Sequence, residues 1–201
     1  MAKNIECEKR VMLSKVQYTT LRKHYLKTQK INKLVKQENV YFDDQIGSIE
    51  KKKAILRIRN KKTMGKGKHD CEITFKFHSE EGSIEINQDI SIKEYKSFKK
   101  KAILPEGEVK EEIQKQIPEL GCLAIIGELT TARYSFHSDN CLIELDKNKY
   151  EGIKDYNLEV EAINLETANN KILEICDEFN IVYTTEYVTK SNRAINKRRG
   201  R

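Results

Sequence analysis

Alternation of charged and apolar residues along many short segments constrains the fold of this chain most. In the segment AILRIRN, residues 54–60, an extended backbone places Arg57 and Arg59 on one side and Leu56 and Ile58 on the other. Such alternation is typical of strands with one buried face. The predicted strands are IECEKR (5–10), VYFDDQI (40–46), AILRIRN (54–60), CEITFKFH (71–78), GSIEINQDI (82–90), TARYSF (131–136), CLIELDKNKY (141–150), YNLEVEA (156–162) and VYTTEYVTK (182–190).

Four other segments carry apolar residues at helical spacing. Ser14 and Asn164 are candidate N-caps for two of them, because their side chains can accept a hydrogen bond from the first turn. The apolar positions are Tyr18, Leu21 and Tyr25; Ile92, Tyr95, Phe98 and Ala102; Val109, Ile113 and Ile117; and Ala168, Ile172, Ile175 and Phe179. The sequence therefore predicts an α+β fold with many antiparallel strands and helices outside, and about nine strands close more readily into a barrel than into an open sheet.

The size and composition of the chain limit the kinds of function that are open to it. With 201 residues, no repeat and no evident linker, we expect one domain over residues 1–191 and a basic tail, 192–201, with little reason to fold. No apolar run approaches the ~18 residues of a membrane span, and no signal peptide is evident, so we expect a cytoplasmic protein without membrane contact. Five scattered cysteines without a CxxC pair indicate neither a zinc site nor a thioredoxin-like motif, and the four histidines are dispersed, so any bound metal needs oxygen ligands.

The charged faces of the predicted strands are segregated by sign. Paired acids occupy some strands, whereas Arg57, Arg59 and Arg133 occupy others. Acids about 7 Å apart on one strand repel each other unless cations lie opposite. Facing acid pairs suit a hard divalent ion, and arginines facing the same space suit phosphate oxygens. The acid pairs are Glu6 and Glu8, Glu144 and Asp146, and Glu159 and Glu161.

An ordered series of motifs resembles the CYTH superfamily, the triphosphate tunnel metalloenzymes. The family's N-terminal ExExK pattern is matched by Glu6, Glu8 and Arg10, although the family usually has lysine where Arg10 stands. The resemblance covers nearly the whole chain. The further matching segments are YFDD (41–44), LRIR (56–59), ITFK (73–76), ARYSF (132–136), IELDKNKYEGIKDYNLEVEA (143–162) and TKS (189–191), the last resembling the family's closing strand.

The resemblance implies an eight-stranded antiparallel β-barrel whose charged interior forms a tunnel, with helices packed outside. It also implies Mg²⁺ or Mn²⁺ as cofactor, and Glu6, Glu8, Arg10 and Lys76 as the residues of catalysis. The implied metal ligands are Glu6, Glu8, Glu159 and Glu161, with Asp146 next and Glu144 and Glu85 as further candidates. The implied triphosphate-binding residues are Arg10, Arg57, Arg59, Lys76, Arg133 and Lys190.

The resemblance implies metal-dependent hydrolysis of a triphosphate, and the absence of an aromatic-rich base pocket favours inorganic tripolyphosphate. A class IV-type adenylate cyclase and a thiamine triphosphatase are the enzymatic alternatives. A non-catalytic module that binds polyphosphate, nucleotide or RNA is the alternative of another class, and the net charge of +7 suits any anionic partner. We expect a small triphosphate-containing partner rather than nucleic acid, and the oligomeric state, including a homodimer, stays open.

Overall fold

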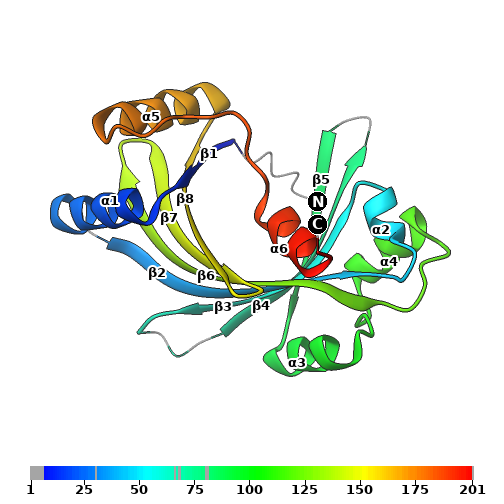
Figure 1. The fold of residues 1–201 in the computed structure, drawn as a ribbon. Helices are drawn as coiled ribbons and strands as arrows, with labels where there is room; N and C mark the ends of the chain where they lie inside the picture. Colours follow the sequence, from blue (N-terminus) through cyan, green and yellow to red (C-terminus); the bar gives the residue numbers. More distant parts are fainter. Residues whose placement is uncertain (1–6, 30, 66, 68, 80–81, 201) are drawn as a thin grey trace.

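Eight antiparallel strands form one strongly curved sheet (Figure 1). A computed structural model of the chain describes residues 7–29, 31–65, 67, 69–79 and 82–200, so Glu6 lies outside the described residues. The strand order is β1-β8-β7-β6-β2-β3-β4-β5, and every neighbouring pair is antiparallel. The strands are β1 (Glu8–Leu13), β2 (Ile31–Asp43), β3 (Ile55–Thr63), β4 (His69–Ser79), β5 (Gly82–Ile90), β6 (Ala124–Ser138), β7 (Cys141–Tyr150) and β8 (Ile153–Ala162).

Six helices accompany the sheet in the described part of the chain. The four predicted helices are confirmed, and two of them begin with a capping box, at Ser14 and at Ser91. Most of the apolar residues that predicted them are buried, although Ile92 at the start of α3 is exposed. The helices are α1 (Lys15–Thr28), α2 (Ser48–Lys51), α3 (Ile92–Lys101), α4 (Glu108–Gln116), α5 (Leu165–Glu178) and α6 (Lys190–Arg198).

The two larger apolar cores lie on the outer face of the sheet. One core packs α1 and α5 against Val11, Ile143 and Val160 of three neighbouring strands. The other packs α3 and α4 against β2 to β5, with Phe42 and Phe98 stacked 4.5 Å apart. Because side chains alternate along a strand, burying this apolar face turns the charged residues inward. The alternation that predicted the strands therefore also determines the content of the interior.

The predicted α+β class, with eight antiparallel strands and helices outside, is confirmed. The sheet curves around a central space, and β1 and β5 are its two edges. Within the part of the chain that the structure describes, no hydrogen-bonded pairing joins these two edges. None of the described helices is long and apolar enough to cross a membrane.

The end of the chain differs from the prediction. Residues 182–190 were expected to form a ninth strand, but 182–189 pair with no strand in the structure and Lys190 begins α6. Alternation alone does not provide a neighbouring strand, and here local contacts favour a helix start. The Thr189 side chain accepts a hydrogen bond from the backbone of Asn192, and Arg193 donates to the Val188 carbonyl at 2.6 Å.

The expectation that the basic tail would not fold is also wrong, because α6 lies inside the curve of the sheet (Figure 1). Ala194 is fully buried against Tyr41, Leu129 and Tyr150. A side chain at Gly127 would place its Cβ 3.1 Å from Ile195, so a glycine permits this close approach. The boundary predicted between residues 191 and 192 falls within this helix.

The acids of the YFDD segment hold the loops at one end of the sheet. Asp43 accepts hydrogen bonds from the backbone of Ile49 and Glu50 at the start of α2. Asp44 accepts from the Ser48 hydroxyl at 2.6 Å and from the Gly121 backbone at 3.0 Å. Burial raises the pKa of Asp44, but these hydrogen bonds outweigh it and lower that pKa to about 2. This pair of acids therefore has a structural role.

We expect Asp44→Asn to lower the free energy of unfolding by about 1–2 kcal/mol at neutral pH, since it removes charge-assisted hydrogen bonds. The folded-state pKa lies below its ordinary value of 3.8, so the stabilisation is present above that value and disappears as the pH falls toward about 2. Urea unfolding of wild type and variant should therefore converge in acid. Asp89→Asn, at an exposed position on β5, is the control, and an Asp44→Asn deficit that persists unchanged in acid would contradict this role.

Candidate active site

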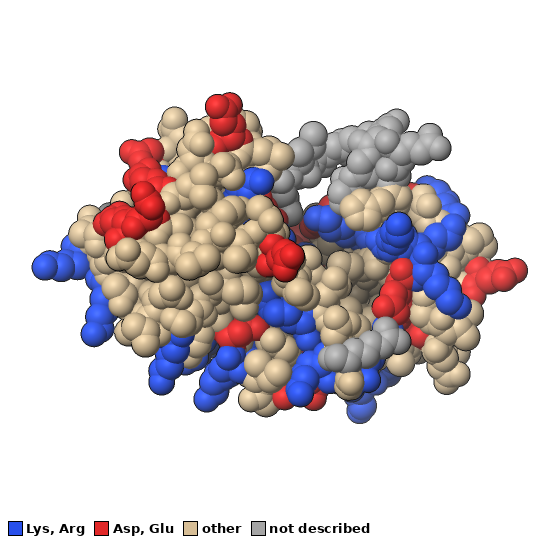
Figure 2. Space-filling view, turned by 45° about the horizontal axis from the view of Figure 1, so that its top comes forward, with Lys and Arg blue, Asp and Glu red and all other residues tan. Residues whose placement is uncertain are grey.

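A polar cavity of about 250 Å³ occupies the concave face of the sheet, beside α6. Figure 2 shows acidic and basic side chains together around the hollow at the centre of this face. Nearly all the predicted site residues that the structure describes line this cavity, and Asp146 lies directly beneath it, in contact with Arg133. The predicted residues in the lining are Glu8, Arg10, Arg57, Arg59, Lys76, Glu85, Arg133, Glu144, Glu159, Glu161 and Lys190.

Strand register concentrates the acids on one side of the cavity. Glu8 of β1 lies directly opposite Glu161 of β8. Glu144 of β7 lies opposite Glu159 of β8 in the same way. Like charges directly opposite each other in an antiparallel sheet are destabilising unless a cation relieves them. Two such pairs on adjacent strands make this side of the cavity a site for cations.

Arg133 and Lys190 supply positive charge to the deepest acids. Arg133 makes a two-pronged contact with Asp146, at 2.8 and 2.7 Å, and its guanidinium reaches Glu159 at 2.5 Å and also contacts Glu144. Lys190, at the first position of α6, donates to Glu159 at 2.8 Å and to Asp146. Asp146 is fully buried and Glu159 is 5% exposed, so water screens these pairs weakly. The contacts tie three strands to α6.

The pKa values of this group follow from burial and pairing. Burial raises the pKa of Asp146 and of Glu159, but Arg133 and Lys190 outweigh it and lower both pKa values. For Glu144, burial dominates over Arg133 and raises the pKa. Burial lowers the pKa of Lys190, yet Asp146 and Glu159 more than compensate and raise it. The paired acids are thus held as carboxylates, and Glu144 is the buried acid with least compensation.

The opposite side of the cavity is basic and comes from β3 and β4. Arg57 donates to Thr74 at 3.0 Å, and Arg59 donates to Asn39 at 2.7 Å and to Glu72 at 3.3 Å. Burial, reinforced by the nearby Arg57, lowers the pKa of Arg59 to about 10. Two guanidinium groups held close together in a buried place repel each other, so this side of the cavity favours binding of an anion.

Sequence reasoning placed Lys190 on a closing strand, but its side chain reaches the cavity from the N-terminus of α6. Several further lining residues were not predicted. For Thr74 the alternation was a sufficient signal, because it lies between Glu72 and Lys76 on the inner face of β4. For the missed residues at or just before the start of α6, the sequence alone gave no signal, because their place in the cavity depends on the fold. The missed lining residues are Gln37, Asn39, Tyr41, Ile55, Thr74, Tyr187, Thr189 and Ser191.

Comparison with known proteins identifies the family of this curved sheet and its charged interior. A sequence model described as the CYTH domain matches residues 4–189. The chain belongs to the CYTH domain family. The predicted resemblance is therefore confirmed, and with it the tunnel fold, which solved members share at the level of the whole chain.

Proteins similar to this chain carry names from two activities. A Bacillus subtilis (strain 168) protein named "Putative triphosphatase YjbK" is 29% identical over 182 residues, 90% of each chain. A Bacillus halodurans crystal structure described as a "putative adenylate cyclase" is 28% identical, with a TM-score of 0.80 over 96% of this chain and 98% of that one. The Hippeastrum protein HpAC1, whose structure is described as revealing a dominant triphosphatase activity, shares the fold at 19% identity, with a TM-score of 0.77 over 93% of each chain.

The acids of the cavity suit a divalent metal by their chemistry. Carboxylate oxygens are the ligands that Mg²⁺ and Mn²⁺ prefer. In the described residues no three acids, histidines or cysteines are gathered into a ready-made metal cluster, because Arg10, Arg133 and Lys190 lie among the acids. Among the described residues, Glu161 makes no ion pair, and Glu8, opposite it at the β1 edge, is paired with Arg10 of its own strand. These two residues fit a metal best, with Glu159 next to them.

We expect Asp146→Asn to lower the free energy of unfolding by about 3 kcal/mol without added metal, because Arg133 and Lys190 would each lose part of a buried ion pair. Glu161→Gln is the matched comparison: it removes one acid of an opposed pair, and we expect its stability to equal or exceed that of wild type. Chemical denaturation in the presence of chelator measures both. Equal destabilisation of the two variants would contradict the distinction drawn here between paired and unrelieved acids.

Proposed function

We propose that this protein is a divalent-metal-dependent triphosphatase whose substrate is inorganic tripolyphosphate. The observation that carries the proposal is the division of one cavity into an acidic and a basic side. Arg57 and Arg59 lie on one side and the opposed glutamates on the other, within about 250 Å³. A site that only held an anion would not need carboxylates, whereas a metal bound to phosphate needs both. The triphosphatase name of the B. subtilis relative supports this choice.

The basic residues would bind and orient the phosphate chain. Guanidinium groups pair with phosphate oxygens through two parallel hydrogen bonds, and Arg57 and Arg59 are already held in place by Thr74 and Asn39. Lys76, 3.5 Å from Glu85 at the far end of the basic side, would contribute a point charge. Arg10 and Lys190 would contact the phosphate chain of the substrate from the acidic side of the cavity. Positioning and charge neutralisation account for most of the catalysis of phosphoryl transfer.

The carboxylates would hold the metal. Glu8, Glu159 and Glu161 would be its main protein ligands, with Glu6 of the same motif, which lies outside the described residues, as a fourth. Asp146 and Glu144 would not contact the metal directly but would hold Arg133 in place beside it. A bound Mg²⁺ or Mn²⁺ neutralises charge on phosphate oxygens and lowers the pKa of a bound water. Arginine at position 10 keeps its proton, so a proton for the leaving phosphate would come from Lys76 or solvent.

The size of the cavity favours a compact substrate. Pockets for larger organic ligands usually measure about 300–1,000 Å³ and are mostly apolar. This cavity is smaller and carries charged groups on nearly every strand. Inorganic tripolyphosphate presents charge along its whole length, so its form suits this lining better than a nucleotide or thiamine triphosphate.

Adenylate cyclase activity is the second candidate, because the 28%-identical B. halodurans structure is described with that activity. Both reactions need the same metal and the same phosphate contacts, and they differ in the attacking group. Incubation with ATP separates them: a cyclase yields cyclic AMP and pyrophosphate, and a hydrolase yields orthophosphate and ADP. A protein that binds triphosphates but yields neither set of products would instead be the non-catalytic binding module.

Tripolyphosphate hydrolysis should disappear in EDTA and return when Mg²⁺ or Mn²⁺ is added in excess. The reason is that the described residues lining the cavity include no histidine or cysteine, so the opposed glutamates need a hard cation. Phosphate release with tripolyphosphate, ATP and thiamine triphosphate, each with both metals, measures activity and substrate preference together. Undiminished hydrolysis in chelator would refute the proposal.

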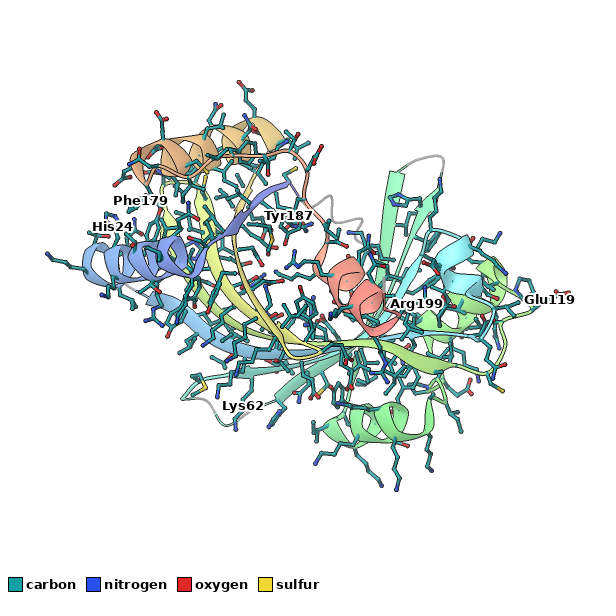
Figure 3. The ribbon with its side chains drawn as sticks, in the orientation of Figure 1. His24, Lys62, Glu119, Phe179, Tyr187 and Arg199 are labelled. Atoms are coloured by element: carbon teal, nitrogen blue, oxygen red, sulfur yellow. The ribbon has the colours of Figure 1, made fainter. Side chains whose placement is uncertain are left out.

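Arg57→Ala and Arg59→Ala should each weaken tripolyphosphate binding by about 1.5–3 kcal/mol, the range of a hydrogen bond to a charged group. Lys62→Ala is the matched control, because Lys62 lies on the same strand and is exposed on its outer face (Figure 3). Steady-state kinetics and calorimetric titration of the metal-bound protein would measure the loss. An equal effect of all three substitutions would place the arginine contribution in the general charge of the protein rather than in the cavity.

A further inference from the structure

Tyr187 connects the end of the chain to the acidic side of the cavity. It belongs to the segment between α5 and α6, which crosses the concave face of the sheet, and it lines the cavity (Figure 3). Arginines from two separate elements lie over its ring. The guanidinium carbon of Arg10, on β1, is 5.6 Å from the ring centroid, and that of Arg193, on α6, is 5.2 Å from it. Both distances are within the range of a cation–π contact.

The other partners of Arg10 are acids that the metal would use. Arg10 contacts Glu8 of its own strand, and its Nε lies 3.3 Å from Glu159. Both carboxylates are among the ligands proposed for the divalent cation. A metal that takes these oxygens weakens their hold on the guanidinium, and of the three partners described here only the Tyr187 ring stays available to Arg10.

The second arginine at the Tyr187 ring, Arg193, is itself firmly held. Arg193 is 10% exposed in its side chain and binds Asp155 through Nε at 2.9 Å. It also donates to the carbonyl of Val188, the residue next to Tyr187, at 2.6 Å. Asp155 in turn accepts hydrogen bonds from Asn148 and from the Tyr150 hydroxyl at 2.9 and 2.7 Å. The ring therefore rests on a group fixed to β7 and β8 and does not depend on the acids of the cavity.

We propose that Tyr187 is a positioning residue that keeps Arg10 directed at the triphosphate when the metal occupies Glu8 and Glu159. This inference rests on the proposed triphosphatase function and adds to it a residue that the motifs did not indicate. A planar guanidinium stacks on an aromatic face, whereas the ammonium of lysine is a compact and strongly hydrated charge. The contact thus explains how an arginine at position 10 can be held in place on an edge strand.

A double-mutant cycle tests the proposal, with Tyr187→Leu, Arg10→Lys and the combined variant. We expect Tyr187→Leu to raise the KM for metal-bound tripolyphosphate about five- to thirty-fold, the range of a desolvated cation–π contact, with a smaller change in kcat. In the Arg10→Lys background the same substitution should have little further effect. Tyr187→Phe keeps the ring and should rescue the KM. Additive effects of the two substitutions would overturn the proposal.

Two controls separate this role from a structural one. Tyr183→Leu removes a half-buried tyrosine of the same segment, packed against the outer core, and should lower the melting temperature without the rise in KM. Binding of a methylene-bridged tripolyphosphate analogue, followed by calorimetry, should be weakened by Tyr187→Leu more with Mg²⁺ than in EDTA, where Arg10 keeps its acid partners. Equal weakening in both conditions would also overturn the proposal.

The design distinguishes the failure of this inference from the failure of the proposed function. A wild-type protein that hydrolyses no triphosphate refutes the function, and the analogue titration then decides the role of Tyr187 by itself. A wild-type protein that is active, with Tyr187→Leu unchanged in both KM and analogue affinity, refutes only the inference. If Tyr187→Leu does not fold, Arg193→Met removes the second arginine that contacts the ring, and we expect a rise in KM that again depends on Arg10.

Discussion

The ion pairs of Arg133 and Lys190 with Asp146 and Glu159 are the interaction on which the interior depends. A sheet that buries its apolar face against outer helices must turn its charged face inward. Four acids on two adjacent strands would repel one another there without nearby cations. Arg133 provides one cation from β6 and Lys190 another from α6, so the same contacts relieve the repulsion and connect the C-terminal helix to the sheet.

The C-terminal helix α6 makes two kinds of contact, apolar packing and ion pairs. Ala194 and Ile195 pack on Tyr41, Leu129 and Tyr150 and fill one part of the concave face with apolar groups. Lys190, one turn earlier, reaches the acids. Two of the basic residues that follow are paired with acids of the protein itself: Arg198 lies 3.6 Å from Glu128 and from Glu151, and Arg199 lies 2.5 Å from Glu50. The basic end of the chain thus stabilises the fold locally.

The alternation of side chains between the two faces of each strand made much of the candidate site predictable. Once Leu56 and Ile58 face the outer core, Arg57 and Arg59 must face the cavity, and no knowledge of neighbouring strands is needed. Which cation meets which acid was not predictable, because it depends on the register between strands, some of them far apart in sequence, such as Arg10 of β1 opposite Glu159 of β8. The helix α6 was missed because alternation in 182–190 fits a strand equally well, and only the missing neighbour and the Thr189 cap decide against it.

Because basic residues already neutralise the acids, the proposed metal and the proposed triphosphate would not bind to this site independently. A divalent cation that takes oxygens of Glu159 competes with Arg10, Arg133 and Lys190 for them. Cations released in this way would need an anion, and the proposed triphosphate would supply it at the same place. Arginines that bound phosphate would in turn leave carboxylates free for the metal. The physical consequence would be positive coupling: each ligand would lower the free energy of binding of the other, and by thermodynamic linkage the two effects would be equal in size.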